Sequence, residues 1–343
     1  MRRLVMGGIL VVVALGMFCA AAERKSEPLQ IYFIDVEGGQ ATLVVSPQGQ
    51  SLLIDTGWAG FDGRDAERIA AAAHDAGVKQ IDYVLITHYH LDHVGGVPQL
   101  LARMKVGTFV DHGPNMEDSD VTRADYAVYQ KAIAGHPHLV LKPSQGLPFK
   151  GIEVQVLAAA GEHIAGPLPA AGEANPYCAA EPEAPADPSE NGRSMGVLVT
   201  YGKFRFLDLG DLTKKKELEL VCPNNLLGTV DLYLTTHHGM DSSNAKALVW
   251  AVHPRVAVMN NGARKGASPA AWQIVHDSPG LEDLWQLHYA MDAGKDHNVA
   301  EDRIANVDDG KAAGNYIEAA AEADGSFTLT NARNGARKSY AKR

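Results

Sequence analysis

The chain has 343 residues, of which 46% are hydrophobic and 21% are charged, and its formal net charge is −10. This composition can build a sizeable core, and it excludes a chain that is disordered throughout. The negative charge disfavours binding of a polyanion unless the binding cleft is locally basic. The length fits one large domain or two domains of ordinary size.

The N-terminus has the pattern of a secretory signal. Arg2 and Arg3 precede the apolar run LVMGGILVVVALGMF, and the small residues CAAAE follow it. The run is shorter than the roughly 20 residues that a membrane span needs. We therefore expect residues 1–22 to be a cleaved signal peptide, with a periplasmic or extracellular protein and no stable membrane span after cleavage. An uncleaved anchor is the alternative, and a lipoprotein at Cys19 fits poorly because Phe18 precedes it.

The next elements alternate between strand and helix patterns. Residues 29–57 read as several short strands joined by turns. Residues 64–77 have helix-forming composition, and Gly77 is placed to end the helix. Residues 81–90, IDYVLITHYH, predict a buried strand that runs into a polar cluster. Residues 161–190 are rich in Pro, Ala and Glu and lack periodicity, so we expect a surface insertion or flexible loop there.

A weak internal repeat relates two parts of the chain. LLIDTG (52–57), a helix and the strand at 81–90 are echoed by FRFLDLGD (204–211), a helical stretch and VDLYLTTHHG (230–239). Each copy runs strand, acidic turn, helix, strand, histidine. This order predicts two βα halves packed sheet to sheet, with helices outside. Chance similarity between apolar strands is the alternative.

Two further features leave alternatives open. Export would place Cys178 and Cys222 in an oxidising compartment, where they could pair, but the sequence does not show whether they meet. The basic tail, residues 331–343, carries five basic and no acidic residues, and we expect a solvated, frayed terminus.

The strongest signal is the motif H-x-H-x-D-H, formed by His88, His90, Asp92 and His93. Alternate residues of an extended segment point the same way, so His88 and His90 can face one ion. Asp92 and His93, on the next turn, can face a second ion. Imidazole nitrogen and carboxylate oxygen are ligands that suit Zn²⁺. A solvated histidine-rich loop is the alternative, but four ligand-type residues directly after a buried strand favour a metal.

This motif resembles the signature of the metallo-β-lactamase-like hydrolases. Asp55 in LIDTG, Asp211 in LGDL and His237 in TTHHG match the rest of that family's pattern in order. The stretches FIDVEGGQATLVV, NGRSMGVLVTYGKFRFLDLGD and TTHHGMDSS are similar, more closely, to the hydrolase-like domain of bacterial DNA-uptake competence channel proteins. The resemblance covers roughly residues 29–330. It implies a single α/β domain, a four-layer αββα sandwich of two mixed sheets with outer helices.

The resemblance also implies a metal site with one departure from the family pattern. The implied metal ligands are His88, His90, Asp92, His93, Asp211 as the bridge, and His237. Asp55 would orient a ligand histidine through a hydrogen bond. The wider family has another histidine shortly before the bridging aspartate, where this chain has Asn191, a weak zinc ligand, and Ser194. His163 from the insertion is the alternative to Asn191. The implied cofactor is therefore one or two Zn²⁺ ions, with Mn²⁺ as an alternative that accepts oxygen ligands.

Metal-assisted hydrolysis would use a metal-activated water. We expect Asp92 to be required for turnover. His238, beside the expected ligand His237, would donate a proton to the leaving group or make a structural hydrogen bond. Lys265 lies in a loop that either faces the substrate or is solvated.

Three functions fit these patterns. The first is an exported metal-dependent hydrolase of phosphodiesters, with nucleic acid as a candidate substrate. The second is an exported β-lactamase or lactonase that opens small cyclic amides or esters; it ranks lower because such enzymes usually keep the histidine that is missing here. The third is a non-catalytic module that binds a metal or ligand.

Overall fold

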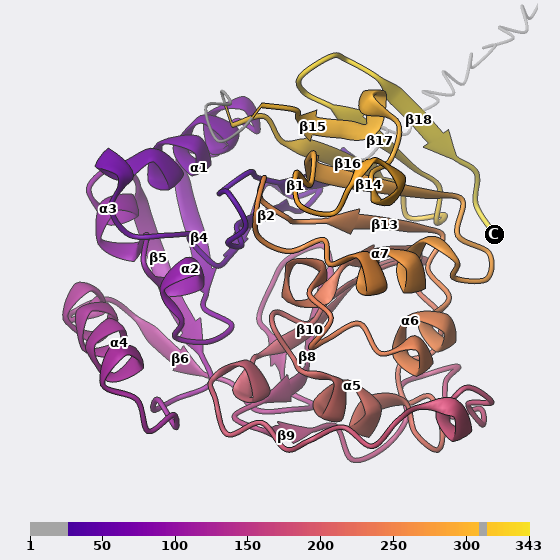
Figure 1. The fold of residues 1–343 in the computed structure, drawn as a ribbon. Coiled ribbons are helices and arrows are strands. Elements are labelled where there is room, and N and C mark those ends of the chain that lie inside the picture. Colours follow the sequence, from indigo (N-terminus) through magenta and orange to yellow (C-terminus); the bar gives the residue numbers. More distant parts are fainter. Residues whose placement is uncertain (1–26, 309–313) are drawn as a thin grey trace, which may run out of the picture.

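Two β-sheets form the centre of the molecule (Figure 1). The computed structural model describes residues 27–308 and 314–343, and within these ranges each sheet has nine strands. The expected signal peptide, residues 1–22, lies outside the described residues. Within the described ranges, no helix combines the length and the apolar character that a bilayer crossing requires.

The first sheet has the strand order β18-β17-β16-β1-β2-β3-β4-β5-β6. Its strands pair antiparallel from β18 to β3 and parallel from β3 to β6. The bounds are β1 Leu29–Phe33, β2 Thr42–Val45, β3 Ser51–Ile54, β4 Gln80–Leu85, β5 Lys105–Asp111, β6 His138–Val140, β16 Ile317–Ala321, β17 Phe327–Asn331 and β18 Arg337–Tyr340.

The second sheet has the order β15-β14-β13-β12-β11-β10-β8-β7, with β9 paired to β8. It is antiparallel from β7 to β11 and parallel from β11 to β15. The bounds are β7 Gly146–Leu147, β8 Glu153–Ala159, β9 Glu162–His163, β10 Gly196–Tyr201, β11 Phe204–Asp208, β12 Leu232–Leu234, β13 Val256–Met259, β14 Asp283–His288 and β15 Ile304–Asn306.

Helices cover the outer face of each sheet. The α-helices are α1 Arg64–Asp75, α2 Leu91–Val94, α3 Val97–Leu101, α4 Asp120–Ile133, α5 Lys214–Val221, α6 Lys246–Val252 and α7 Pro269–His276. Short 3₁₀ turns occur at η1 Phe61–Gly63, η2 Cys178–Ala180, η3 Asn191–Arg193, η4 Thr236–Gly239, η5 Lys295–His297 and η6 Glu301–Arg303. The helix expected at 64–77 is confirmed as α1, and Gly77 follows its end with a φ of 70°.

Three apolar clusters separate four layers. The central cluster lies between the sheets, where the rings of Phe33 and Phe206 meet edge to face at 5.6 Å. Because successive strand residues point to opposite faces, the neighbouring Tyr32 belongs to a different cluster, under α1, α3 and α4. A third cluster packs α5, α6 and α7 on the second sheet. The predicted αββα sandwich of two mixed sheets is confirmed (Figure 1).

The two halves that the sequence repeat predicts occupy corresponding places in the two sheets. β3 and β4 are parallel neighbours joined through α1, and β11 and β12 are parallel neighbours joined through α5. A hairpin joins β10 to β11, with Gly202 at a φ of 58°. The carboxyl ends of both strand pairs therefore carry the acidic turns and the histidines.

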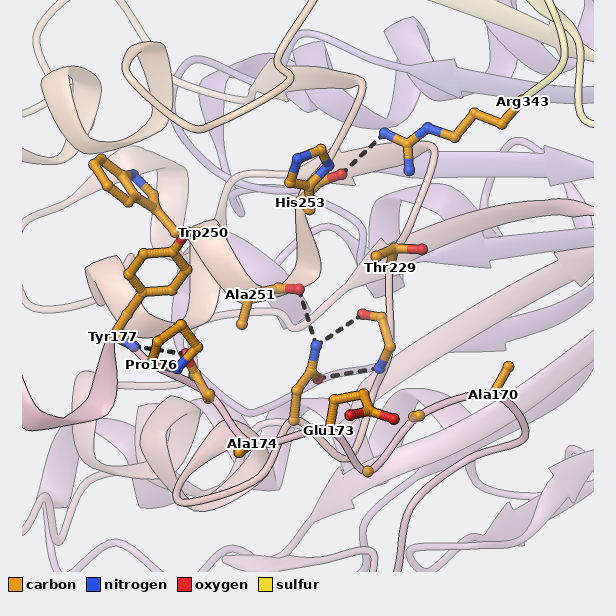
Figure 2. A pocket seen from close by; sticks show the side chains of 15 residues that line it. Ala170, Glu173, Ala174, Pro176, Tyr177, Thr229, Trp250, Ala251, His253 and Arg343 are labelled. Carbon is orange, nitrogen blue, oxygen red and sulfur yellow. Dashed lines mark hydrogen bonds between the residues drawn. The ribbon is translucent and has the colours of Figure 1, made fainter.

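The insertion at 161–190 is irregular, as expected, but it is anchored to the second half. Cys178 and Cys222 form a disulfide, which answers the question that the sequence left open. The buried Asn175 side chain donates to the backbone carbonyls of Val221 and Ala247. Figure 2 shows the insertion forming one wall of a pocket, with Tyr177 set against Trp250 of α6 at 5.3 Å.

The prediction of a frayed terminus for residues 331–343 is wrong. Arg337–Tyr340 forms the edge strand β18, which pairs with β17. Tyr340 is buried, accepts a hydrogen bond from Trp285 Nε1 at 3.0 Å and donates one to Asp283 Oδ2 at 2.9 Å. Lys338, one of the basic residues of this tail, pairs with Asp283 on the second sheet.

Candidate metal centre

The candidate ligands lie where parallel strands of both sheets end. Asp55 follows β3, and His88 and His90 follow β4. Asp211 follows β11, and His237 with its neighbour His238 follows β12 in the turn η4. Carboxyl ends of parallel neighbours meet at one edge of a sheet, and the packed sheets bring the two edges together. The fold therefore gathers side chains that lie up to 183 residues apart in the chain.

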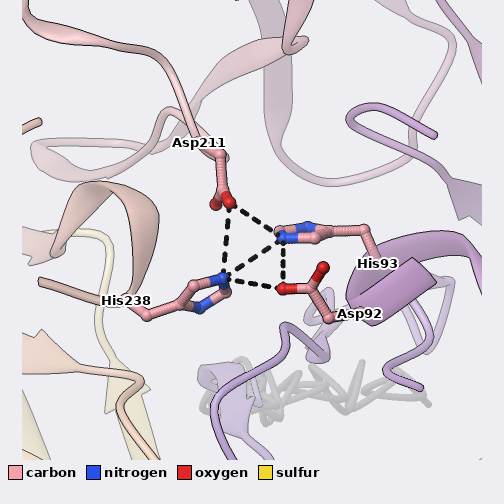
Figure 3. Close-up of side chains that lie close together, drawn as sticks. All are labelled: Asp92, His93, Asp211 and His238. Atoms are coloured by element: carbon pink, nitrogen blue, oxygen red, sulfur yellow. Dashed lines mark hydrogen bonds and ion pairs between the residues drawn. The ribbon is translucent and has the colours of Figure 1, made fainter. Parts of the chain in front are cut away.

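Asp211 and His238 meet two residues of the short helix α2, Asp92 and His93. These four side chains form a compact buried group, called the cluster below (Figure 3). Their facing atoms are the Oδ2 atoms of the aspartates and the Nε2 atoms of the histidines. The recorded distances are 3.4 Å for Asp92–His93, 3.2 Å for His93–Asp211, 3.2 Å for Asp92–His238, 3.4 Å for Asp211–His238 and 3.3 Å for His93–His238.

These five distances agree with the spacing between donors around a tetrahedral ion, and the sixth, between the two aspartates, is within 4.8 Å. Zinc bonds of roughly 2.0–2.1 Å place tetrahedral donors about 3.3 Å apart. Two imidazoles and two carboxylates are also donors of the right kind for zinc. In addition, Asp211 Oδ1 and His238 Nδ1 are buried and have no hydrogen-bond partner among the described residues. The chain's own residues thus fit a divalent metal at this position.

The electrostatics of the cluster favour a positive charge at its centre. Burial alone would lower the pKa of His93, but Asp211, Asp92 and Asp55 outweigh burial and raise that pKa well above its usual range. Burial would raise the pKa of Asp211, but His237, His238 and His93 hold it well below its usual range. Two buried carboxylates need such a counter-charge, which a proton or a metal ion can supply.

Asp55 contacts the side of His93 that faces away from the cluster. Asp55 Oδ2 lies 2.7 Å from His93 Nδ1, and Asp55 also accepts hydrogen bonds from the backbone N–H and the hydroxyl of Thr87 at 2.8 and 2.7 Å. When His93 carries its proton on Nδ1, it donates a hydrogen bond to Asp55, and the lone pair on Nε2 points toward the cluster. This geometry is the one that a histidine held for metal binding requires.

His88 and His90 form a second set of donors beside the cluster. His88 Nε2 lies 3.1 Å from His90 Nδ1 and 4.0 Å from Asp211 Oδ2. Burial lowers the pKa of His88 well below its usual range, so its imidazole is neutral and can bind a metal. His90 Nε2 contacts Glu117 Oε2 at 2.9 Å, a partner that the sequence analysis did not identify. Asp211 is the residue that the two sets share.

Ser194 lies in the segment before Asp211, where the family pattern implies the additional histidine, and it contacts His88. Ser194 Oγ lies 3.3 Å from His88 Nδ1 and accepts a hydrogen bond from the backbone N–H of Asp211 at 3.2 Å. Asn191, which we expected as a weak ligand, lies in η3, and its Oδ1 is buried without a hydrogen-bond partner among the described residues. Among the residues that the structure describes, no hydrogen bond joins Asn191 to His88 or His90.

His237 and His238 contact different sets of side chains. His238 Nε2 faces both carboxylates of the cluster. His237 Nε2 lies 3.4 Å from Asp211 Oδ2, and its Nδ1 lies 3.0 Å from Ser242 Oγ and 3.2 Å from Ser243 Oγ. Both histidines have a φ of 54°, a left-handed conformation that non-glycine residues rarely adopt. This turn directs two consecutive imidazoles to the same aspartate.

A second group of acidic residues and histidine has its own counter-charge. His288 Nε2 lies 2.8 Å from Asp35 Oδ1 and 3.3 Å from Glu37 Oε2. Arg68 pairs with the second oxygen of each carboxylate, at 2.8 Å for Asp35 and 3.3 Å for Glu37. Because the guanidinium supplies the positive charge, this group is explained as an ion-pair network that joins β1, α1 and β14.

The fold and the comparisons define the class of protein. Residues 34–178 match the family model of the metallo-beta-lactamase superfamily. This match to residues 34–178 confirms the predicted resemblance to the metallo-β-lactamase superfamily. Members of this superfamily are mostly hydrolases and bind divalent metals, typically zinc or iron.

Particular relatives cover part of the chain. The chain is 24% identical to the ComE operon protein 3 of Bacillus subtilis over 279 residues, 76% of this chain and 32% of that protein. It is 24% identical to the Recombination protein 2 of Haemophilus influenzae over 243 residues, 70% of this chain and 25% of that protein. A Ribonuclease Z of Alkaliphilus oremlandii is 34% identical over 64 residues, 19% of this chain and 18% of that protein. The chain thus spans a third or less of the length of these relatives, and the similarity is that of a competence-protein-like hydrolase domain.

Proposed function

We propose that this chain is an exported metal-dependent hydrolase that acts on phosphodiesters, with nucleic acid as a candidate substrate. The observation that carries the proposal is the cluster, which presents four buried donors at tetrahedral spacing beside the His88–His90 pair. A two-metal arrangement suits in-line displacement at phosphorus. The partial similarity to a Ribonuclease Z supports the same substrate class.

We assign the cluster residues as one ligand set, and His88 and His90 as a second set that shares Asp211. Zn²⁺ is the expected ion for the first set, and Mn²⁺ is the alternative for the second, which has Ser194 where the family has a histidine. When bound, such ions supply an activated water and a Lewis acid for developing negative charge. Asp55 holds the His93 ring in the orientation that this binding needs.

We also propose a reversal of the two adjacent histidines. His238 is assigned as a ligand because its Nε2 faces Asp92 and Asp211. His237 is assigned to proton transfer because its Nδ1 contacts Ser242 and Ser243 and its Nε2 is left at the edge of the cluster. Burial lowers the pKa of His237, so the neutral ring can accept a proton at Nε2 and return it to a leaving group.

Export remains a prediction from residues 1–22. The disulfide between Cys178 and Cys222 supports it, because structural disulfides are rare in reducing compartments.

The test combines metal analysis with a substrate panel. The purified full chain is analysed for bound transition metal and then assayed with Zn²⁺ or Mn²⁺ on bis-nitrophenyl phosphate, single-stranded DNA, a lactone and a chromogenic β-lactam. We expect one to two equivalents of metal and turnover of the phosphodiesters. Asp92→Ala should abolish turnover, whereas Asp120→Ala, which removes an exposed carboxylate on α4, should not. Turnover of only the lactone or the β-lactam would favour the second function of the sequence analysis, and absence of bound metal would favour the non-catalytic module.

A further inference from the structure

Lys265 is a cation at the edge of the cluster that the proposed chemistry has not yet used. Its ammonium contacts Asp92 Oδ2, the same atom that faces His93 and His238. The ammonium also lies 4.7 Å from the centre of the Trp58 ring. The Lys265 side chain is 31% exposed, whereas the Asp92 side chain is 11% exposed. The Lys265 side chain therefore lies between the buried cluster and the solvent.

The loop that carries Lys265 is fastened to the segment that carries His238. The backbone N–H groups of Ala267 and Ser268 donate to the carbonyls of His238 and Gly239, both at 2.9 Å. Opposite this loop stands Gly38, where a side chain would meet Lys265 Cβ at 2.9 Å. Backbone hydrogen bonds and a close approach thus hold the stem of Lys265 beside the donors.

The charges indicate what this lysine binds. The two aspartates of the cluster carry two negative charges, which a divalent metal would balance. A metal at the cluster and the Lys265 ammonium would then repel each other, because both lie next to Asp92 Oδ2. This repulsion would weaken the ion pair between Lys265 and Asp92. With its hold on Asp92 weakened, the ammonium would keep its place beside the Trp58 ring, an arrangement that stabilises a cation. The site would then present a local positive charge on a chain whose net charge is −10.

The Trp58 ring is the aromatic surface that lies next to the Lys265 ammonium. The two segments that contact Lys265 also carry exposed apolar side chains: Phe61, three residues after Trp58, is 62% exposed, and Leu91, next to Asp92, is 36% exposed. The Trp58 ring offers contact area for an apolar or aromatic group of a ligand.

We propose that Lys265, held on Trp58, binds an oxyanion of the substrate next to the bond that is hydrolysed. This inference rests on the hydrolase function proposed above and adds the charge of the substrate to it. Lys265 then selects esters or amides that carry a negative charge and an apolar group over neutral analogues. A phosphodiester oxygen and a carboxylate share this chemistry, and the probes below distinguish them.

The experiment measures binding to the metal-loaded full chain by titration calorimetry. The probes are phenyl phosphate, benzoate and benzyl alcohol, which share an aromatic ring and differ in charge. The variants are Lys265→Met, which keeps the alkyl stem against Trp58, and Lys265→Arg, which keeps the charge. The matched control is Arg264→Met in the same loop, because Arg264 pairs with the exposed Asp292.

We expect Lys265→Met to weaken phenyl phosphate about tenfold, the effect of one charge-assisted contact, and to leave benzyl alcohol unchanged. Lys265→Arg should recover part of the affinity, and Arg264→Met should bind like the unmodified chain. Zinc affinity of Lys265→Met, measured by chelator competition, should be equal or higher because Asp92 loses a competing cation. A tenfold loss confined to benzoate would also support the anion site and would assign a carboxylate as its ligand.

Two results would overturn the inference. The first is equal affinity of Lys265→Met and the unmodified chain for both anions. The second is a loss of zinc affinity in Lys265→Met, which would make Lys265 a structural part of the metal centre. Failure of the hydrolase proposal is a separate outcome: the unmodified chain would then bind phenyl phosphate through Lys265 but hydrolyse no phosphodiester in the panel.

Discussion

The contact between Asp55 and His93 gives the sharpest test of the metal centre. The change is Asp55→Asn, which keeps the size of the side chain and removes its charge. Asp55 is fully buried, and its Oδ2 lies 2.7 Å from His93 Nδ1. An asparagine turned so that its oxygen still faces His93 loses the charge-assisted part of this bond, and one turned the other way presents an N–H₂ group to the ring. Either arrangement weakens the hydrogen bond that orients the His93 ring and lowers the basicity of His93 Nε2.

The magnitude follows from the role of such carboxylates. Removing a carboxylate that orients a ligand histidine weakens metal binding roughly 10- to 100-fold. This loss corresponds to about 1.4–2.7 kcal/mol of binding free energy. We expect Asp55→Asn to fall in this range for zinc, measured by competition with a chromogenic chelator at neutral pH, with the fold checked by circular dichroism.

Asp111 supplies a matched control. It is also a buried aspartate at the end of a parallel strand, β5, and its Oδ2 lies 2.8 Å from His138 Nε2 and accepts a 2.8 Å hydrogen bond from Tyr129. No atom of Asp111 or His138 belongs to the cluster. Asp111→Asn should therefore lower stability without changing zinc affinity. A folded Asp55→Asn variant that binds zinc as tightly as the unmodified chain would refute the assignment of His93 as a ligand held by Asp55.

Three further predictions concern the rest of the chain. His238→Ala should weaken zinc binding at least 100-fold, and His237→Ala less than tenfold, because His238 Nε2 faces both carboxylates of the cluster whereas His237 Nε2 contacts only that of Asp211. Replacing Cys178 and Cys222 by serine should lower the unfolding free energy by about 4 kcal/mol, from a closed loop with a sequence separation of 44, and leave the metal content unchanged. Burial raises the pKa of Glu217 from 4.5 to about 7. The folded chain therefore holds a proton that the unfolded chain releases, and the unfolding free energy of the unmodified chain, relative to Glu217→Gln, should fall by about 3 kcal/mol between pH 4.5 and 7.

Each of these has a clear contrary result. Equal zinc affinities of the two histidine variants would return the ligand role to His237. A serine double variant as stable as the unmodified chain in denaturant titrations would show that the insertion is held by its other contacts. Parallel stability–pH curves for Glu217→Gln and the unmodified chain would show that Glu217 is ionised in the folded state below pH 7.

Much of the metal centre could be predicted from local sequence. His88, His90, Asp92 and His93 lie within six positions after an apolar strand, and their order places them at one strand end whatever the rest of the chain does. The family resemblance implies Asp55, and the structure places it at the end of β3, the parallel neighbour of β4. The αββα layers follow from the alternation of strand and helix patterns in the two halves.

Other residues depended on how distant segments pack. A φ of 54° at both His237 and His238 turns the two imidazoles toward Asp211, and only the packing of the two halves brings the His238 ring to Asp92 as well. Glu117 reaches His90 from a separate loop, and Lys265 reaches Asp92 across the two halves. Periodicity and spacing carry no information on such contacts.

The C-terminal segment shows the same division between sequence and tertiary structure. Its basic composition predicts a solvated end, yet Tyr340 packs on Phe327 at 4.7 Å and binds Asp283 on the opposite sheet. The sequence by itself determined which residue types could hold a metal and at which strand ends they stand. Only the tertiary structure decided which of two neighbouring side chains faces the centre and which loops complete it. The physical reason is that local pattern sets the direction of a side chain relative to its own strand, whereas contacts between segments depend on the packing of the whole chain.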